Sequence, residues 1–205
     1  MLKRHLVALV AVLAFAVASA QDLRAWMDLN FGDSPEIVQA KMEAMQAEGR
    51  IAPGGVWQGQ DYSRIARDPT SSTYPVSIAG VDMRLNFDFY DNKLYRLNFD
   101  TSPVNASYWD AEVLPNAAIV RDVLRTALGA PSSRYNVGFL DMRNGFIKWT
   151  DVWRSGGVSR YLGLYESGSR FGVELRIEWD WMARFIAEHE GQEREQGIQD
   201  AAGGF

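Results

Sequence analysis

The stretch VDMRLNFDFYDNKLYRLNFD, residues 81–100, decides the fold of this chain. Apolar and polar residues alternate on both sides of Asp91-Asn92, and a period of two is typical of a half-buried strand. The first apolar row is Val81, Met83, Leu85, Phe87 and Phe89, and the second is Tyr95, Leu97 and Phe99. We therefore predict two antiparallel strands with one buried face and one wet face, joined by a tight turn.

The parity of the two rows constrains this turn. A two-residue loop at Asp91-Asn92 would place Arg96 opposite Phe87 on the buried face, and burying a row of arginines is costly. A three-residue loop, or a bulge, would instead give the apolar pairs Phe89–Tyr95, Phe87–Leu97 and Leu85–Phe99. We therefore predict a loop of odd length.

Helix signals lie on both sides of this strand pair. Upstream, Ser34 is a good N-cap, Pro35 suits the first helical position, and Gly49 ends the helix. Downstream, a second helix is predicted over about 115–128, and Gly129 and Pro131 stop it. Strands are then predicted over 146–153, 160–165 and 171–179, followed by a last helix from Asp180.

The order of helix, connector and antiparallel strands thus occurs twice. We predict an α+β fold of two similar helix-then-antiparallel-strand units, about 30–105 and 113–180, which form one layered domain over 21–191. The helices are expected on one face of the sheet, with a further C-terminal helix, and 192–205 is predicted to be a flexible tail. The connector 50–75 is rich in glycine and proline and is predicted to be a long loop, a kind of segment that often carries function.

The N-terminus has the layout of a cleaved secretory signal. Lys3, Arg4 and His5 precede an apolar run over 6–17, and the small residues Ala18 and Ala20 occupy the two positions that a signal peptidase reads. The run is shorter than the roughly 20 residues that span a bilayer. We therefore expect residues 1–20 to be removed and the rest to be soluble, periplasmic or extracellular, with no membrane insertion after cleavage.

The amino-acid composition limits the classes of partner that can be expected and the interactions that can stabilise the fold. Without Lys3 and Arg4, the chain has 19 basic residues against 26 acidic ones, a net charge of −7, so nucleic acid is not expected as a partner. The chain has no cysteine, so disulfides do not stabilise it and burial must.

Two segments resemble a known family. The stretch VRDVLRTALGAPSSR (120–134), followed by IKWTDVW (147–153), is similar to the helix, Leu-Gly-x-Pro stop and tryptophan-bearing strand of small outer-membrane lipoprotein domains of the SmpA/OmlA type. The stretch FGDSPEIVQAKM (31–42) resembles the helix start of such a unit, and the fold of that family resembles the tandem units of the β-lactamase inhibitor protein. The resemblance implies a non-catalytic α+β module that binds other proteins. This chain departs from the family in having no lipobox cysteine and in starting its second helix with Leu-Pro-Asn.

Residues that would carry catalysis or bind metal are scarce. The expected mature chain has one histidine, His189, in a polar run near the C-terminus, and no cysteine. Neither a nucleophilic triad nor a transition-metal site is expected, and no phosphate-binding glycine loop is present. We predict no catalytic residues, no cofactor and no metal. A pair of carboxylates among Asp82, Asp88, Glu174 and Glu178 on the wet strand faces is the one enzymatic alternative.

The tryptophans offer a further signal. Trp149 and Trp179 are expected in the core, whereas strand parity does not place Trp57, Trp109 or Trp153 there. These three are candidate interface anchors, or else they cover the sheet edges as part of a satellite core. Our leading hypothesis is an exported, non-catalytic protein that binds another protein or an envelope component. The alternatives are a small-ligand binder that uses the 50–75 loop as a lid, and a carboxylate-based hydrolase.

Overall fold

The strand pair at residues 81–100 is β5 (Val81–Tyr90) and β6 (Lys93–Asp100), which pair antiparallel. The predicted pairs Leu85–Phe99 and Phe87–Leu97 are confirmed. The predicted odd-length loop is wrong, because Asp91 and Asn92 form a two-residue turn with φ of 49° and 55°, the conformation that suits the twist of a hairpin.

A β-bulge in β6 restores the parity that this short turn would break. Phe89 pairs with Leu94 rather than with Tyr95, and the register shifts between Asp88 and Phe89 so that Tyr95 is the extra residue. Leu94 joins the main core, whereas Tyr95 joins a second, smaller cluster. Because of the bulge, the adjacent residues Leu94 and Tyr95 pack in different hydrophobic clusters.

The structure is a computed structural model that describes residues 24–54, 66–67 and 73–203. Within these ranges, nine strands form one antiparallel sheet in the order β3-β5-β6-β11-β10-β9-β8, with β4 paired to β5 and β7 paired to β11. The two remaining strands, β1 (Arg24–Trp26) and β2 (Leu29–Asn30), form a separate ribbon. The other strands are β3 (Ala66–Arg67), β4 (Tyr74–Ile78), β7 (Val104–Asn105), β8 (Ser133–Arg134), β9 (Ile147–Ser155), β10 (Val158–Ser167) and β11 (Arg170–Trp179).

Three α-helices accompany the sheet: α2 (Pro35–Ala47), α3 (Leu114–Leu128) and α4 (Asp180–Gly203). The predicted start of α2 is confirmed, since the Ser34 hydroxyl accepts a hydrogen bond of 3.4 Å from the backbone N–H of Ile37. Short helical turns occur at Ala106–Tyr108, Trp109–Val113 and Phe139–Asp141. α4 continues through most of the segment 192–205, for which the sequence predicts a tail.

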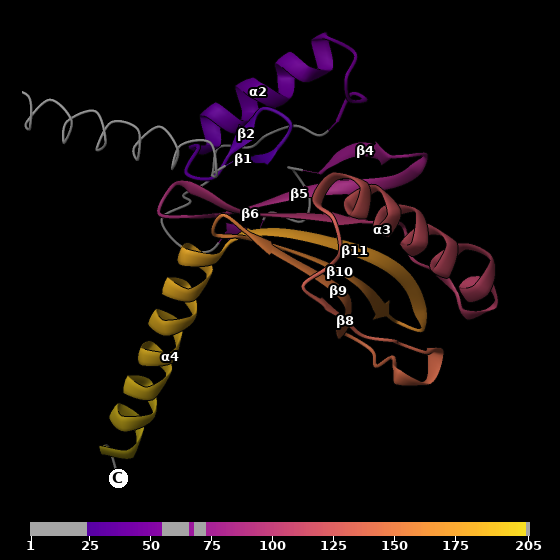
Figure 1. Cartoon of the computed structure of the whole chain (residues 1–205). Coiled ribbons are helices and arrows are strands. Elements are labelled where there is room, and N and C mark those ends of the chain that lie inside the picture. The colour runs from indigo at the N-terminus through magenta and orange to yellow at the C-terminus, as the bar shows by residue number, and fades with distance from the viewer. Residues whose placement is uncertain (1–23, 55–65, 68–72, 204–205) are drawn as a thin grey trace, which may run out of the picture.

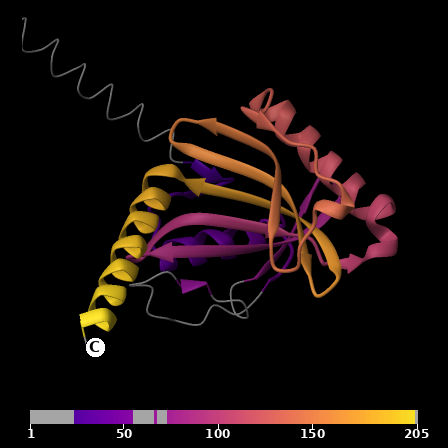
Figure 2. The ribbon, with the colours of Figure 1, turned by 90° about the horizontal axis from the view of Figure 1, so that it is seen from below.

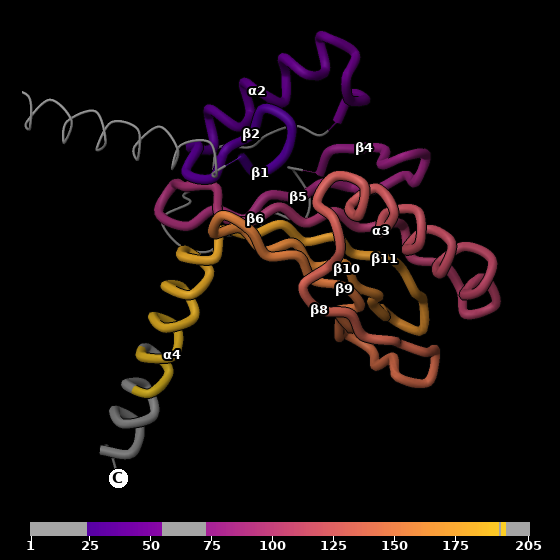
Figure 3. The backbone as a smooth tube through the Cα atoms, viewed as in Figure 1, coloured from indigo at the N-terminus to yellow at the C-terminus, as the bar shows by residue number. Residues whose placement is uncertain are grey.

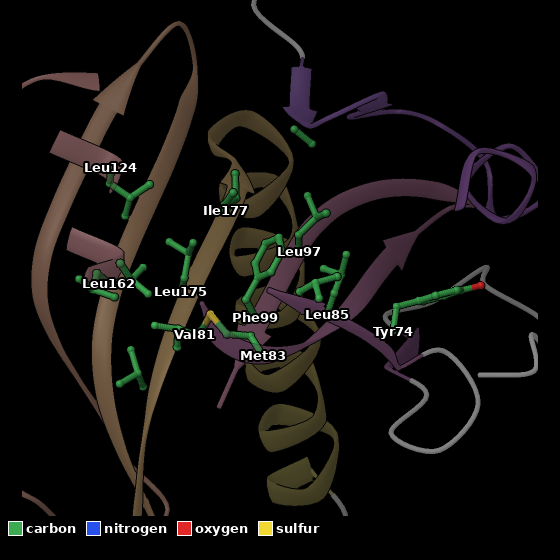
Figure 4. Close-up of a cluster of buried hydrophobic side chains, with 14 of the residues drawn as sticks. Tyr74, Val81, Met83, Leu85, Leu97, Phe99, Leu124, Leu162, Leu175 and Ile177 are labelled. Carbon is green, nitrogen blue, oxygen red and sulfur yellow. The ribbon is translucent and has the colours of Figure 1, made fainter. Parts of the chain in front are cut away.

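Helices α2 and α3 lie on one side of the sheet (Figure 1). α4 starts where β11 ends and runs away on the other side, as the backbone trace also shows (Figure 3). The main core lies between α2, α3 and the sheet. Figure 4 shows side chains from β5, β6, β10, β11 and α3 pointing toward one another, among them Leu85, Leu97, Phe99, Leu162 and Leu175. The predicted α+β class, antiparallel sheet and C-terminal helix are confirmed.

A buried ion pair joins α3 to the sheet. Asp151 of β9 is fully buried, and its Oδ2 atom accepts hydrogen bonds from Arg121 Nε at 2.7 Å and from the Thr150 hydroxyl at 2.9 Å. Arg134 Nε lies 3.7 Å from the other carboxylate oxygen. The buried charge of Asp151 therefore depends mainly on the arginine that α3 supplies.

We predict that Arg121→Met lowers the free energy of unfolding by about 3 kcal/mol, because removing one partner leaves a buried charge uncompensated. Urea denaturation followed by circular dichroism measures this loss. Arg125→Met, at an exposed position of the same helix, is the matched control and should change stability by less than about 0.5 kcal/mol. Equal losses in the two variants would show that the ion pair adds nothing.

The buried phenol of Tyr95 makes the anchoring of α4 sensitive to alkaline pH. Burial raises the pKa of Tyr95 from 10.0 to about 12, while the unfolded chain keeps the ordinary value. The folded pKa is the higher one, so this contribution to stability is complete below the unfolded pKa and is lost as the pH rises through the folded pKa.

We therefore predict that the wild-type protein loses more stability than Tyr95→Phe between about pH 9 and about pH 11. Urea denaturation at the two pH values measures the difference. Tyr135→Phe, at an exposed position, should lose as much as the wild type. A Tyr95→Phe variant with the wild-type pH dependence would contradict the prediction.

Candidate functional site

Figure 2 views the sheet from the side that α2 and α3 do not cover. This side carries a network of charged side chains, here called the polar face. Its members alternate with the core residues along three neighbouring strands and meet in cross-strand rows. The first row is Arg84, Asp100 and Glu174, the second is Asn86, Asn98 and Arg176, and the third is Asp88, Arg96 and Glu178.

Arginines compensate the carboxylates of this face. Arg96 donates hydrogen bonds to Asp88 at 3.4 Å and to Glu178 at 3.2 Å. Arg176 donates to Glu174 at 3.0 Å, and Arg84 pairs with Asp100. Since several of these groups are buried, the ion pairs satisfy charge that would otherwise be costly.

Two glycines let aromatic rings lie flat on the polar face. A Cβ atom at Gly163 would lie 2.7 Å from the ring of Trp149, and one at Gly172 would lie 2.5 Å from the ring of Tyr165. The predicted core position of Trp149 is wrong. A bulge in β9 makes Thr150 the extra residue and places Trp149 opposite Gly163 on the polar face, where the ring is half-buried and the Arg176 guanidinium lies 4.7 Å from its centre.

A hollow of about 450 Å³ lies where this face meets the start of β9. Its walls include Arg84, Asp100, Glu174, Tyr165 and Phe146. Tyr165 donates a hydrogen bond of 2.6 Å to the carbonyl oxygen of Thr101, and burial raises its pKa to about 12. Asp100 and Glu174 are cross-strand neighbours here, and each already accepts a hydrogen bond from an arginine. Of the carboxylates of the hydrolase hypothesis, Asp88 and Glu178 both accept from Arg96.

A second hollow, of about 840 Å³, lies between the end of α2 and strand β4. It is open to solvent, and its walls include Arg50, Ile51, Pro53, Pro75 and Asp82. These residues belong to the two described ends of the 50–75 connector and to β5. The small-ligand hypothesis expects an enclosed cavity under this connector; the hollow borders the described ends of the connector but is open, and most of the expected lid lies outside the described residues.

The segment 135–146 presents exposed apolar side chains at the edge of the sheet. We call Tyr135, Phe139, Leu140 and Phe146 the apolar corner. Leu140 is 95% exposed and Phe146 is 64% exposed, and Phe146 also lines the first hollow. These four exposed apolar side chains fall within twelve consecutive residues, and exposed apolar surface of this kind often marks an interaction site.

The backbone of this corner is held firmly. The ring of Phe139 lies 5.5 Å from that of Trp109 and 5.1 Å from that of Phe171. The Asp141 carboxylate accepts a hydrogen bond of 2.8 Å from the backbone N–H of Gly138. The backbone N–H of Gly145 donates to the Glu166 carbonyl at 2.9 Å, which joins the segment to the end of β10. The exposed rings therefore sit on a fixed scaffold.

Two of the three tryptophans proposed as interface anchors lie in the core. Trp109 is 6% exposed and Trp153 is 3% exposed, so both lie in the core and neither presents its ring to a partner. The Trp153 indole N–H donates to the Gly129 carbonyl at 3.0 Å, which ties β9 to the end of α3. Trp57 lies outside the described residues. The apolar corner was not predicted, because its residues follow neither a helical nor a strand period.

Several further features were sought in the described residues. His189 is exposed on α4, and its ring lies 6.1 Å from that of Phe185. Within residues 24–54, 66–67 and 73–203, no group of three or more His, Cys, Asp or Glu side chains is placed to hold a metal ion. None of the helices in this part of the chain is long and apolar enough to cross a membrane.

Comparison of the chain with protein-family models, with curated proteins and with solved structures found no match. The similarity to the SmpA/OmlA-type domains therefore remains a prediction from residues 31–42, 120–134 and 147–153.

We predict that Gly172→Ala lowers the free energy of unfolding by about 1–3 kcal/mol, because the new methyl group must displace the Tyr165 ring. A double-mutant cycle with Tyr165→Ala, measured by urea denaturation, tests this cause. In the Tyr165→Ala background the added methyl group should cost much less. An equal cost in both backgrounds would place the strain elsewhere.

Proposed function

We propose that this protein is a non-catalytic binding protein whose partner is another protein or an envelope component, and that it engages this partner with the apolar corner. The observation that carries the proposal is Leu140, an almost fully exposed leucine on a turn that is anchored on both sides. Protein interfaces concentrate their binding energy in a few apolar or aromatic anchors that enter pockets of the partner.

The rigidity of the corner supports this proposal. Ordering a loop during association costs about 0.5–1.5 kcal/mol for each immobilised side chain, and a loop that is already ordered avoids much of this cost. Phe139 holds the turn through ring contacts to Trp109 and Phe171, while Leu140 and Phe146 point outward. Binding energy gained by the exposed side chains is therefore not spent on ordering the loop.

The state of the polar face also supports a binding role. A general acid or nucleophile must be free to exchange a proton or to attack a substrate. Asp100, Glu174 and Asp88 instead accept hydrogen bonds from arginines that belong to the same network. We take this arrangement as part of the scaffold rather than as reactive groups.

Export and internal duplication belong to the same proposal. We propose that residues 1–20 are a signal peptide cut after Ala20, and that the protein works in the periplasm or outside the cell. We also propose that 30–105 and 113–180 are two related units. In support, α2 precedes the β5–β6 pair, α3 precedes β9, β10 and β11, and the two halves join where β6 pairs with β11.

Binding of a small ligand is the second candidate. The hollow of about 840 Å³ beside α2 favours it, because ligand pockets commonly have volumes of about 300–1,000 Å³ and combine apolar walls with a few polar groups. Ile51, Val76 and Met83 would supply the apolar walls, and Arg50 and Asp82 the polar groups.

The test is affinity capture from the native envelope or medium with the mature chain as bait. The double variant Leu140→Ser/Phe146→Ser should lose the partner, because both anchors become polar. Ile119→Ser/Val123→Ser is the matched control, since these apolar residues of α3 are also exposed and lie outside the corner. The expected result is a protein retained by the wild type and the control and depleted by at least about tenfold with the corner variant.

A partner that both variants retain equally would contradict the role of the corner. Capture of nothing, together with a small molecule that raises the melting temperature of the wild type but not of Arg50→Ala, would instead favour the second candidate. Circular dichroism and thermal melting of each variant establish that it is folded before capture.

A further inference from the structure

A further hollow, here called the α4 hollow, lies between the first turns of α4 and the polar face. Its volume is about 430 Å³, and pockets for small ligands commonly have volumes of about 300–1,000 Å³. Figure 2 shows α4 running along this end of the sheet. The lining residues are Arg154, Ser159, Tyr161, Glu178, Asp180, Ala183, Arg184 and Ala187. None of them belongs to the apolar corner, so a role for this hollow does not rest on the proposed function.

Two small residues of α4 leave this space open. Met182 and Ile186 pack with Tyr95 and so dock the helix on the sheet. Ala183 and Ala187 each follow one of these docking residues in the sequence, and both line the hollow. Because an alanine side chain ends at its methyl group, the helix is docked along one side and stands away from β10 along the other.

A buried hydroxyl group without a partner lies in the wall of the hollow. Ser159 is 1% exposed, and its Oγ atom makes no hydrogen bond within the part of the chain that the structure describes. Its cross-strand neighbours are Arg154 on β9 and Glu178 on β11, so its side chain points to the polar face, where the hollow lies. Most buried polar side-chain atoms do have a hydrogen-bond partner. An unpaired hydroxyl at this place therefore indicates a polar atom of a bound molecule.

Two arginines line the hollow, Arg154 from the sheet and Arg184 from the helix. The Arg154 guanidinium lies 5.9 Å from the centre of the Tyr161 ring, and Arg184 Nε donates a hydrogen bond of 3.3 Å to the Asp180 carbonyl. Among the described residues, neither guanidinium pairs with a carboxylate. Each arginine has five N–H donors, so most of these donors are available to an anion in the hollow.

The carboxylates at the hollow are compensated by other arginines. Glu178 accepts a hydrogen bond of 3.2 Å from Arg96, which also donates to Asp88. Burial lowers the pKa of Arg160, and the negative charge of Asp180 nearby opposes this change. Together with the two arginines that line the hollow, this set has four arginines and three carboxylates and a net charge of +1. The hollow can therefore accept a single negative charge.

We propose that the α4 hollow binds a small organic acid, whose carboxylate lies between Arg154 and Arg184 and accepts a hydrogen bond from the Ser159 hydroxyl. A carboxylate has one negative charge, which matches the local net charge, and its two oxygens can accept from both arginines. The Tyr161 ring and the two alanines supply an apolar wall for the body of the acid. The further acidic residues of α4, from Glu188 onward, line no part of this hollow.

The test is titration of the purified mature chain with sodium benzoate, followed by NMR spectroscopy of the backbone amides. Benzoate combines a carboxylate with a flat apolar ring, as the hollow requires. The expected result is a saturable shift of the amide resonances of residues 159–161 and 183–187. Benzamide, which keeps the ring without the charge, and acetate, which keeps the charge without the ring, should both bind at least about tenfold more weakly.

Each probe can contradict the proposal. Absence of a saturable benzoate shift at these residues would overturn it, and so would benzamide binding as tightly as benzoate. Acetate binding as tightly as benzoate would overturn the contact between the apolar wall and the body of the acid. Phenyl phosphate binding more tightly than benzoate would overturn the choice of a carboxylate.

Variants locate the site. Arg154→Gln and Arg184→Gln should each raise the dissociation constant of benzoate by about tenfold, because a hydrogen bond to a charged group is lost. Arg125→Gln, at an exposed position of α3, is the matched control and should leave the dissociation constant unchanged. Equal affinities of the Arg154→Gln and Arg125→Gln variants would overturn the site. Circular dichroism establishes that each variant is folded.

Ser159→Ala tests the buried hydroxyl separately. The dissociation constant of benzoate should rise by about fivefold, while the melting temperature without ligand should not fall, because the removed hydroxyl has no partner in the described part of the protein. Wild-type affinity in this variant would overturn the role of the hydroxyl in binding. A lower melting temperature would show that the hydroxyl serves the fold and would overturn the same role.

Discussion

The extra residue in β6 is the constraint on which the rest of this structure depends. Side chains alternate along a strand, so one inserted residue exchanges the faces of everything that follows it. The two-residue turn at Asp91-Asn92 has the twist that a hairpin favours, but its parity would send Arg96 into the core. The bulge at Tyr95 keeps the favoured turn and returns Leu97 and Phe99 to the core. It also places Tyr95 where α4 docks, so the second packing region depends on the same insertion.

On the polar face, which α2 and α3 do not cover, ion pairs and aromatic rings stabilise the sheet. Arg84, Arg96 and Arg176 lie among four carboxylates, so charge is nearly balanced within the face itself. Gly163 and Gly172 then let Trp149 and Tyr165 lie against the backbone, which replaces the covering that a helix would supply. The same strands carry the apolar corner, because the Asn144 side chain accepts from the backbone N–H of Gly168 and Gly145 bonds to Glu166. The corner is thus fixed both by these hydrogen bonds to the end of β10 and by the ring contacts of Phe139 with the core residues Trp109 and Phe171.

Sequence patterns among neighbouring residues predict the helices and strands of this fold well. The errors come from interactions between residues that are far apart in the sequence. Ser34, Gly129 and the alternation around Leu85 act through neighbouring residues, and the structure has the expected helix start, helix stop and strand pairs. The sequence does not reveal a bulge, because a loop with an odd number of residues and a bulge give the same pairing of Leu85 with Phe99. This ambiguity produced the wrong loop, and a second bulge at Thr150 produced the wrong face for Trp149. Burial of Trp109 depends on Phe139 and Phe171, which are far from it in sequence.

The apolar corner had a readable but weak signal. Tyr135–Phe146, YNVGFLDMRNGF, places several large apolar residues among glycines and polar residues without any period. The structure separates these residues by role. Val137 and Met142 pack against the core, Phe139 contacts Trp109 and Phe171 but stays 42% exposed, and Leu140 is almost fully exposed. α4 has the same division, since Met182 and Ile186 dock the helix while Trp181 and Phe185 stay exposed. In both places some residues do both, since Phe139 contacts Phe171 and Phe185 contacts Tyr90 while each remains 42% exposed. Changes to Leu140 are therefore expected to have little effect on folding, whereas Phe139 and Ile186 contribute to the packing that keeps the exposed residues in place.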